Sequence, residues 1–375
     1  MHTPRIRPKV TLDIGPLMET QWTGIPVFTR RLAQALLRHG GMDVEFAFQL
    51  TRIPEAEVLA AIRAGSGAVL RERFESDAAA WGRPIDREGA LLYPSVKDAF
   101  GVATREACTI HDMSTLAMPE FHEQANVAYH MDRMVEELAT SDAVFCISEA
   151  TRAALVAAFP SVAQRTRFLY QYVDWPEQFP LLERNLPRLA LGPYAVVVGT
   201  IEPRKNLGLL LRALDLPELR RSPLRFVVIG RRGWKVDKFM ASVSPAARER
   251  VLFSGFVSEF TKYRLIKGAQ FLIFPSVYEG FGIPALEAMS LGKPVLCSFS
   301  SSLPEVAGDA GVYFDPLSTS EFAAAFGEIS DARKLAALAP LALAGAEAFN
   351  WQRMAGPVAE WVGAAPCVID IECSV

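Results

Sequence analysis

The sequence predicts an α/β protein with two doubly wound domains, each built on a parallel sheet. Three observations predict this fold class. The chain has 375 residues, 50% of them hydrophobic, which is enough for two domains with full cores. Short apolar runs alternate with segments of helical periodicity, as parallel sheets with crossover helices require. The alternation stops at residues 174–193, where four prolines interrupt any periodicity.

The first half begins with a strand and a helix and repeats that pattern. Its expected strands are VTLDI (10–14), VEFAF (44–48), CTI (108–110) and AVFCI (143–147), and its clearest helical segments are 27–38 and 127–140. We expect an N-terminal domain at 1–180, a linker at 181–193, a C-terminal domain at 194–350, and a C-terminal helix and tail at 351–375.

The second half contains continuous apolar runs, which are typical of strands buried on both faces. They are YAVVVG (194–199), FVVIG (226–230), VLFSG (251–255), FLIF (271–274), PVLC (294–297) and VYF (312–314), with a helix expected at 206–214. Ligands of such sheets collect at the carboxyl ends of the strands. Two such domains facing each other would form a cleft.

Composition excludes several classes of protein. The net charge of -3 and the lack of a Lys/Arg-rich block argue against a nucleic-acid partner. The N-terminus has no apolar signal segment, and no run of about 18 apolar residues predicts a membrane span. The odd number of cysteines and the absence of a CxxC pair indicate free thiols in a reducing compartment. The five cysteines are Cys108, Cys146, Cys297, Cys367 and Cys373. We expect a cytoplasmic protein, either free or held at the inner face of the cell membrane.

The segment 274–294 places two carboxylates, Glu279 and Glu287, around a strand-to-helix junction. The helix is expected to begin near Pro284 and to end at Gly292. Amides at its start would favour a diphosphate, and the carboxylates would accept hydrogen bonds from ribose and hexose hydroxyls. The alternative is a solvated Glu279 and a Glu287 that only favours the helix dipole. The backbone expected to contact such a donor belongs to Gly280, Phe281, Gly282 and Ile283.

The run YEGFGIPALEAMSLGKPV closely resembles the E-x7-E region of retaining glycosyltransferases of family 4, which have the two-domain GT-B fold. The resemblance extends to VVVGTIEPRKNL (196–207), VLFSGFVSEF (251–260) and SSLPEVAGDAGVYFDP (301–316). It is looser in the first half, at TGIPVFTRRLAQAL, TIHD and FCISEATR. It implies two Rossmann-like domains facing across a cleft, and a reaction that retains the anomeric configuration.

An anion site is expected ahead of the helix at 206–214. There a strand ends, a helix starts, and two cations, Arg204 and Lys205, stand side by side. The resemblance implies that both cations contact the donor diphosphate. Thr200 stands where the family often has Arg. Because no D-x-D metal cluster stands out, the cations and the amides of 281–283 could replace a metal, so we expect no metal or other cofactor. The alternative is a basic pair that is simply exposed.

Phe256 and Val257 follow the strand VLFSG, and the resemblance implies that they pack against the donor base. An ordinary strand-end turn explains them equally well. The run VVIGRRGW, which ends at Trp234, resembles bacterial mannosyltransferases of the family. The alternative is that the Trp234 side chain only covers the core.

In the first half, His111 and Asp112 follow the strand CTI, and the resemblance implies that His111 lines the transferred sugar. Gly24 would allow close approach of phosphate or sugar. Arg152 and Asp112 are candidates for the acceptor or a phosphate, although Arg152 fits a solvated helix start as well. Basic residues on helix 27–38, outside its apolar stripe, suggest contact with an anionic bilayer. The apolar stripe of the helix is typical of core packing.

The predicted function is the transfer of a hexose to a glycan or lipid-linked acceptor during the synthesis of bacterial surface polysaccharide or lipopolysaccharide. The hexose that fits best is mannose, with GDP-mannose as the donor. In this scheme Glu279 orients the sugar and Glu287 binds the ribose. The same motifs permit UDP-glucose or UDP-N-acetylglucosamine as donor. A non-catalytic scaffold of the same fold is the alternative from another class, and the presence of Glu279, Lys205, Glu287 and His111 argues against it.

Overall fold

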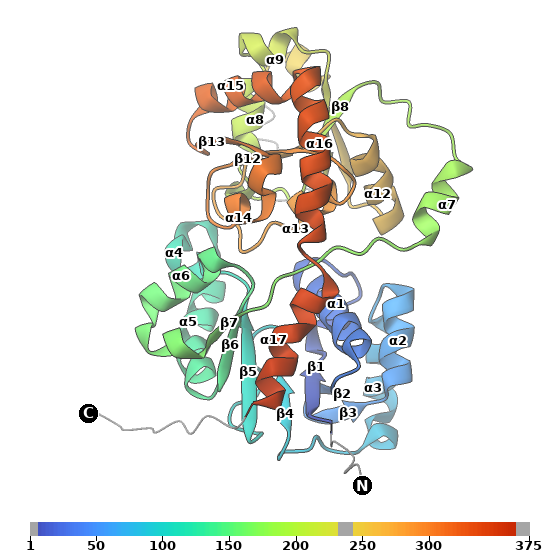
Figure 1. The fold of residues 1–375 in the computed structure, drawn as a ribbon, viewed down its shortest axis with the longest axis vertical. Helices are drawn as coiled ribbons and strands as arrows, with labels where there is room; N and C mark the ends of the chain where they lie inside the picture. Colours follow the sequence, from blue (N-terminus) through green and yellow to red (C-terminus); the bar gives the residue numbers. More distant parts are fainter. Residues whose placement is uncertain (1–6, 232–242, 365–375) are drawn as a thin grey trace. The chain divides into compact units, whose positions relative to one another are not determined.

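The computed structural model describes residues 7–231 and 243–364. Trp234, Cys367 and Cys373 lie outside these ranges, as does the tail of the expected segment 351–375. The chain divides into two compact units (Figure 1). One is Met1–Gln171 with Trp351–Val375, and the other is Tyr172–Asn350.

The first unit contains a seven-stranded sheet in the order β3-β2-β1-β4-β5-β6-β7. Only the β2–β3 pair is antiparallel among the described strands. The strands are β1 (Lys9–Asp13), β2 (Asp43–Phe48), β3 (Thr51–Ile53), β4 (Ala90–Leu92), β5 (Arg105–Ile110), β6 (Ala143–Cys146) and β7 (Thr166–Phe168). The helices are α1 (Gly24–His39), α2 (Glu55–Ala64), α3 (Ala68–Trp81), α4 (Ser114–Ala117), α5 (Gln124–Ala139), α6 (Glu149–Ala158) and α17 (Trp351–Gly363).

The last helix, α17, belongs to the first unit although it follows the second along the chain. Trp361 anchors it because the indole is buried and lies edge-on to Phe145, with ring centroids 6.0 Å apart. The Arg105 guanidinium lies 5.3 Å from the same indole and donates to the carbonyl of Ala364 at 2.8 Å. The segment expected to stand apart as a C-terminal helix and tail therefore begins with a helix that completes the first core.

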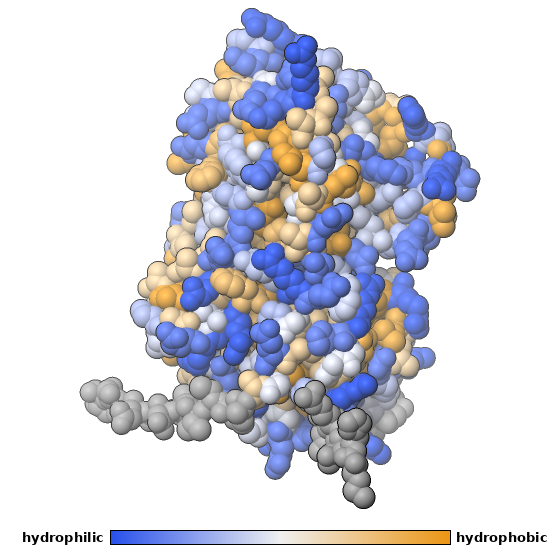
Figure 2. All heavy atoms as spheres, in the orientation of Figure 1, coloured by the Kyte–Doolittle hydropathy of each residue, from blue (hydrophilic) through white to orange (hydrophobic). Residues whose placement is uncertain are grey.

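Helix α1 contacts α17, so one of its faces is covered. Arg31, one of the basic residues expected to flank this helix toward a bilayer, is only 2% exposed. It is therefore part of the packed interior. On the face drawn in Figure 2, hydrophilic side chains are numerous and apolar ones are interspersed among them. Within the described ranges, no helix is both long and apolar enough to cross a membrane.

The second unit contains a six-stranded parallel sheet in the order β10-β9-β8-β11-β12-β13. The strands are β8 (Tyr194–Val198), β9 (Arg225–Ile229), β10 (Val251–Gly255), β11 (Leu272–Phe274), β12 (Val295–Ser298) and β13 (Gly311–Phe314). The helices are α7 (Gln178–Arg184), α8 (Leu207–Ala213), α9 (Pro217–Arg221), α11 (Pro245–Arg248), α12 (Glu259–Gly268), α13 (Ile283–Met289), α14 (Leu303–Ala307), α15 (Thr319–Ile329) and α16 (Ala332–Glu347). Every apolar run predicted as a strand in this half is a strand.

The segment expected to end the first domain and to link the two is partly helical. The division falls between Gln171 and Tyr172, and α7 occupies part of the expected linker. Pro180 is the third residue of α7, where a proline costs no intrahelical hydrogen bond. Phe179 fixes α7 because its ring lies 5.0 Å from Phe260 and 5.5 Å from Tyr263, both on α12. The prolines therefore do not make this segment irregular throughout.

Candidate functional site

The candidate site lies at the carboxyl ends of β8 and β11, which are neighbours in the sheet of the second unit. After β8 the chain turns at Gly199 and forms a short 3-10 helix, η4, at Pro203–Lys205. After β11 it enters the loop 275–282, which leads to α13. Strand order reverses between β8 and β11, and such a switch point is where open α/β sheets bind ligands. The turn at Gly199 packs closely against Gly230, which follows β9. A Cβ on Gly230 would lie 1.9 Å from the carbonyl oxygen of Gly199.

Lys205 and Glu279 meet across this switch point. The Lys205 ammonium donates to both carboxylate oxygens of Glu279, at 2.7 and 2.9 Å. Arg204 lies beside them, with Nη1 3.7 Å from Glu279 Oε2 and 2.9 Å from the carbonyl oxygen of Tyr278. Its Nη2 donates to Glu202 at 3.0 Å. The side chains of Arg204, Lys205 and Glu279 are 16%, 20% and 8% exposed, so neither the basic pair nor the carboxylate is freely solvated.

Serine hydroxyls at the end of β12 and just after it hold the loop that carries Glu279. The Ser301 hydroxyl accepts from the backbone N–H of Glu279 at 2.8 Å. Ser302 donates to the carbonyls of Glu279 and Phe281, both at 2.9 Å. The hydroxyls of Ser298 and Ser300 donate to the carbonyls of Ser276 and Val277. Ser301 has φ of +47°, a left-handed conformation that is unfavourable for serine.

The start of α13 is set by Gly282, whose φ of +104° few other residues can adopt. The helix spans Ile283–Met289, so it is shorter than expected, although Gly292 does follow its end. The Phe281 side chain is buried against Phe349, with centroids 5.5 Å apart. The backbone of Gly280, Phe281, Gly282 and Ile283 therefore leads into α13 as the sequence predicted, and its contact with a donor stays a prediction.

The second carboxylate, Glu287, is paired with a lysine that the sequence did not reveal. Lys262 Nζ lies 2.6 Å from Glu287 Oε1, and the Glu287 side chain is only 1% exposed. The Lys262 ammonium also lies 5.5 Å from the centroid of the Trp175 ring. Lys262 is one of several cations on α12, and no local pattern separates it from Lys267.

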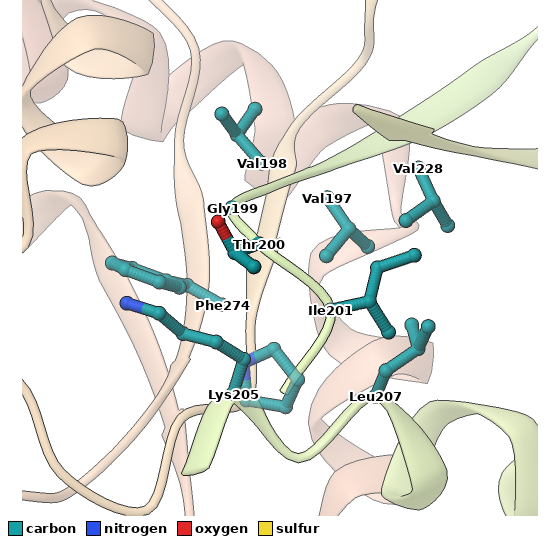
Figure 3. A pocket seen from close by; sticks show the side chains of 10 residues that line it. Val197, Val198, Gly199, Thr200, Ile201, Lys205, Leu207, Val228 and Phe274 are labelled. Atoms are coloured by element: carbon teal, nitrogen blue, oxygen red, sulfur yellow. The ribbon is translucent and has the colours of Figure 1, made fainter. Parts of the chain in front are cut away.

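A small hollow lies under the β8 turn (Figure 3). It has a volume of about 10 Å³, enough for about one water molecule. In Figure 3 the Lys205 side chain extends toward the Phe274 ring, and its ammonium lies 5.7 Å from the ring centroid. Thr200, expected at the donor, lines this hollow. The other lining residues are Val197, Val198, Gly199, Ile201, Leu207, Val228 and Pro275.

The turn expected at the donor base follows β10. Gly255 has φ of +69°, and its carbonyl accepts from the N–H of Gly230 at 3.0 Å, which fixes the turn to the neighbouring strand. The Phe256 ring is 53% exposed, with the Arg231 guanidinium 5.4 Å from its centroid. Val257 is half-buried beside it. An exposed, braced aromatic ring is suited to stacking on a nucleobase.

His111, in the first unit, lies at the carboxyl end of β5. Its Nε2 donates to the carbonyl of Pro94 at 2.7 Å, so Nδ1 is the acceptor of the neutral ring. Phe28 contacts the ring edge-on at 4.7 Å. Burial lowers the pKa of His111, although the bond to Pro94 and the charge of Asp112 oppose that shift. A neutral His111 can therefore accept one hydrogen bond from a hydroxyl. Its backbone carbonyl already accepts from Thr151 at 3.3 Å.

Asp112 and Arg152 have structural contacts within the first unit. Asp112 Oδ1 accepts from the N–H and hydroxyl of Ser114, at 2.9 and 2.6 Å, and so starts α4. Arg152 Nε donates to Thr166 at 2.8 Å, and its guanidinium lies 5.9 Å from the centroid of Phe168. Arg152 is half-buried and paired, so it differs from the solvated arginine that the alternative described. These contacts leave acceptor or phosphate binding by either residue without structural support.

Gly24 is the first residue of α1 and has φ of +29°. A Cβ added there would meet nothing within 4 Å. The backbone conformation, more than a lack of space, therefore explains this glycine.

Asp13, at the carboxyl end of β1, is a titratable residue that the sequence did not reveal. Its Oδ1 accepts from the N–H of Gly15 at 2.9 Å, and its side chain is almost fully buried. Burial, with a smaller effect of the Asp98 charge, raises the pKa of Asp13 to about 7. No group of three or more His, Cys, Asp or Glu side chains that could hold a metal occurs in residues 7–231 and 243–364.

A family profile and a relative from Escherichia coli match parts of this chain. The profile of the family described as Glycosyl transferases group 1 matches residues 186–338, which include β8, β11 and both lysine–carboxylate pairs. O-antigen chain mannosyltransferase B from Escherichia coli is 37% identical over 221 residues. The match covers 56% of this chain and 58% of that protein, so it spans less than two thirds of the relative's length.

Solved structures resemble nearly the whole chain. Sucrose-phosphate synthase from Thermosynechococcus elongatus superposes with a TM-score of 0.66 at 19% identity, over 95% of this chain and 98% of that one. HepE of Anabaena, solved with UDP-glucose, superposes with a TM-score of 0.64 at 18% identity, over 95% of this chain and 100% of that one.

Proposed function

Since the chain has the GT-B glycosyltransferase fold and its residues 186–338 form a Glycosyl transferases group 1 domain, we propose that it is a retaining hexosyltransferase. Its donor in this proposal is GDP-mannose, and its acceptor is a saccharide or lipid-linked precursor of a bacterial surface polysaccharide. The similarity to an O-antigen mannosyltransferase supports this choice of sugar and acceptor. The observation that carries the proposal is the cluster of Arg204, Lys205 and Glu279 at the switch point of the second sheet.

The cluster suits the charge changes of glycosyl transfer. When the anomeric C–O bond breaks, negative charge grows on the diphosphate that leaves. Arg204 and Lys205 would stabilise that charge more in the transition state than in the ground state, which is the requirement for catalysis. Glu279, held by Ser301 and Ser302, would accept hydrogen bonds from the hexose hydroxyls. No step in this scheme requires a metal ion.

Glu287 would accept hydrogen bonds from the ribose hydroxyls of the donor, and Phe256 would stack on its base. His111, through Nδ1, would accept from a sugar hydroxyl. A lipid-linked acceptor implies peripheral contact with the inner face of the membrane. Co-sedimentation with anionic vesicles, with and without such an acceptor, tests that part of the proposal.

UDP-glucose or UDP-N-acetylglucosamine is the second candidate donor, and it is supported by the likeness to HepE, which was solved with UDP-glucose. A non-catalytic scaffold is the candidate from another class. Four potential catalytic side chains, Glu279, Lys205, Glu287 and His111, are all present, and a scaffold has no chemical need for them.

The test begins with thermal unfolding in the presence of GDP, UDP or ADP. A ligand at about 100 times its Kd stabilises the folded protein by about 2.7 kcal/mol. Hydrolysis of the matching sugar nucleotide is then measured for the wild type, for Glu279→Gln, and for Glu328→Gln as a surface control. Stabilisation by GDP, with hydrolysis lost only in Glu279→Gln, supports the proposal. A preference for UDP selects the second donor, and no response to any nucleotide favours the scaffold.

A further inference from the structure

We propose that Lys262 is a positioning residue for the donor ribose, because it fixes Glu287 and is itself held by Trp175. The inference rests on the proposed function, in which Glu287 accepts hydrogen bonds from the ribose hydroxyls. It adds two residues, from α12 and from the segment that enters the second unit, to the set that determines how the donor binds.

Lys262 and Glu287 form a close ion pair in which the lysine is partly exposed and the glutamate is buried. Lys262 Nζ lies 2.6 Å from Glu287 Oε1, and the two side chains are 23% and 1% exposed. A carboxylate so deeply buried has lost its hydration, and hydrogen-bond donors beside it compensate for that loss. The Lys262 side chain, in contrast, is partly exposed. Lys262 is therefore the member of the pair that can adjust its position, and the contacts that hold it decide how firmly Glu287 is fixed.

Trp175 fixes both members of this pair. Its ring faces the Lys262 ammonium at 5.5 Å, a cation–π distance. Its indole N–H donates to the Ser290 hydroxyl at 2.9 Å, and that hydroxyl donates to the backbone carbonyl of Glu287 at 2.8 Å. One side chain thus contacts the lysine and, through Ser290, the backbone of the carboxylate residue. The two contacts limit the movement of Lys262 relative to Glu287.

An aromatic cluster holds Trp175 in turn. Its ring lies 5.4 Å from Tyr263, which follows Lys262 on α12, and 6.4 Å from Phe179 on α7. Phe179 packs against Phe260, also on α12, at 5.0 Å. These contacts bind the segment 172–184 to the helix that carries Lys262. The lysine is therefore placed by packing and not by local sequence.

A carboxylate that is ionised and fixed accepts ribose hydrogen bonds without first reordering, which is the advantage of preorganisation. Loss of Lys262 should weaken the part of nucleotide affinity that depends on the ribose hydroxyls. It should have little effect on the part that comes from the base and the diphosphate. The ratio of affinities for a nucleotide and for its 2′,3′-dideoxy analogue isolates the first part. A purely structural lysine would change both affinities together and leave the ratio unchanged.

The experiment compares binding of GDP and 2′,3′-dideoxy-GDP by calorimetry, or of the UDP pair if UDP binds better. For the wild type we expect a ratio of at least about tenfold, as hydrogen bonds to a charged acceptor provide. Lys262→Met should reduce it to less than about threefold, and Lys262→Arg should restore most of it. Trp175→Phe, which removes the indole N–H, should give an intermediate ratio. The matched control is Lys267→Met, on the same helix but paired with Glu183.

The possible results of this experiment separate the role of Lys262 from the proposed function. A wild-type ratio retained in a folded Lys262→Met variant would overturn the role of Lys262 while leaving the proposed function intact. If Lys262→Met does not fold, Trp175→Phe carries the test, because Lys262→Arg is expected to keep most of the ratio, and a wild-type ratio in Trp175→Phe would overturn the inference. If the wild type binds no nucleotide, the proposed function fails together with this inference. If it binds GDP and dideoxy-GDP equally, the ribose role of Glu287 is wrong and the nucleotide site stands.

Discussion

Ser301 offers a test of how the loop that carries Glu279 is held, because its hydroxyl and its backbone can be changed separately. Ser301→Ala removes the hydrogen bond to the Glu279 N–H and keeps the left-handed conformation at φ +47°. Ser301→Gly removes the same bond and also relieves that conformation. A left-handed residue with a Cβ costs about 1 to 2 kcal/mol, and glycine costs about 0.4 to 1 kcal/mol through the unfolded chain. Glycine should therefore be more stable here than alanine by about 1 kcal/mol.

The lost hydrogen bond is common to both variants and is worth about 1 kcal/mol. We thus expect the free energy of unfolding to fall by about 1 kcal/mol in Ser301→Ala and to change little in Ser301→Gly. A difference of this size separates the two midpoints of thermal unfolding by about 2 to 4 °C for a unit of this length. Donor hydrolysis should fall by about tenfold or more in both, because a displaced Glu279 no longer meets the sugar.

Thermal unfolding and donor hydrolysis are measured on the same preparations, with Ser76→Ala on the exposed surface of α3 as control. Equal stability of Ser301→Ala and Ser301→Gly would show that the left-handed conformation costs no more than the about 0.4 to 1 kcal/mol that glycine loses through the unfolded chain. Full hydrolysis by Ser301→Gly would show that the hydroxyl does not position Glu279. Either result would refute the reasoning.

Three further predictions concern the stability of the two units. Lys97→Met should lower the free energy of unfolding by about 3 to 5 kcal/mol in denaturant titrations, because Glu106, 2.6 Å from Lys97 Nζ, would keep a charge inside the fold; a loss below 1 kcal/mol would contradict this. Asp13 has a folded pKa of about 7 against an ordinary 3.8, so its contribution to stability, present below about pH 4, should fall by about 4 kcal/mol as pH rises to 7. Asp13→Asn should abolish that slope in unfolding measured across pH, and an unchanged slope would assign it elsewhere. Gly230→Ala should yield little folded protein in solubility and circular dichroism assays, because its Cβ would lie 1.9 Å from the Gly199 carbonyl oxygen; a stable variant would exclude this close approach.

Most of the strands that the sequence predicted are buried on both faces. Continuous apolar runs such as YAVVV and LIF are recognisable because both faces of such a strand need hydrophobic side chains. The short strands β3, β4 and β7 have three residues each and were not predicted. β4 exists because it completes the ladder between β1 and β5, and that is a property of the sheet as a whole.

The site was predicted where motif and geometry coincide. Lys205 and Glu279 are 74 positions apart, and both follow strands that end at the same edge, so the rule on switch points brings them together. Lys262 and Trp175 follow no such rule, since α12 presents its residues according to how the aromatic cluster packs. The serine run SFSSSL was visible in the sequence, but its use depends on the path of a loop some 20 residues earlier.

The pairing of each carboxylate with its own lysine resolves a difficulty that the sequence raised. Two carboxylates next to a diphosphate should repel it, and yet both belong to the donor site in the proposed function. In the free protein Lys205 neutralises Glu279 and Lys262 neutralises Glu287, at 2.7 and 2.6 Å. A donor therefore meets two ion pairs and not two bare charges. In the proposed function Arg204 and Lys205 bind the diphosphate, so the lysine that pairs with the carboxylate in the free protein would also attract the leaving group as its charge grows.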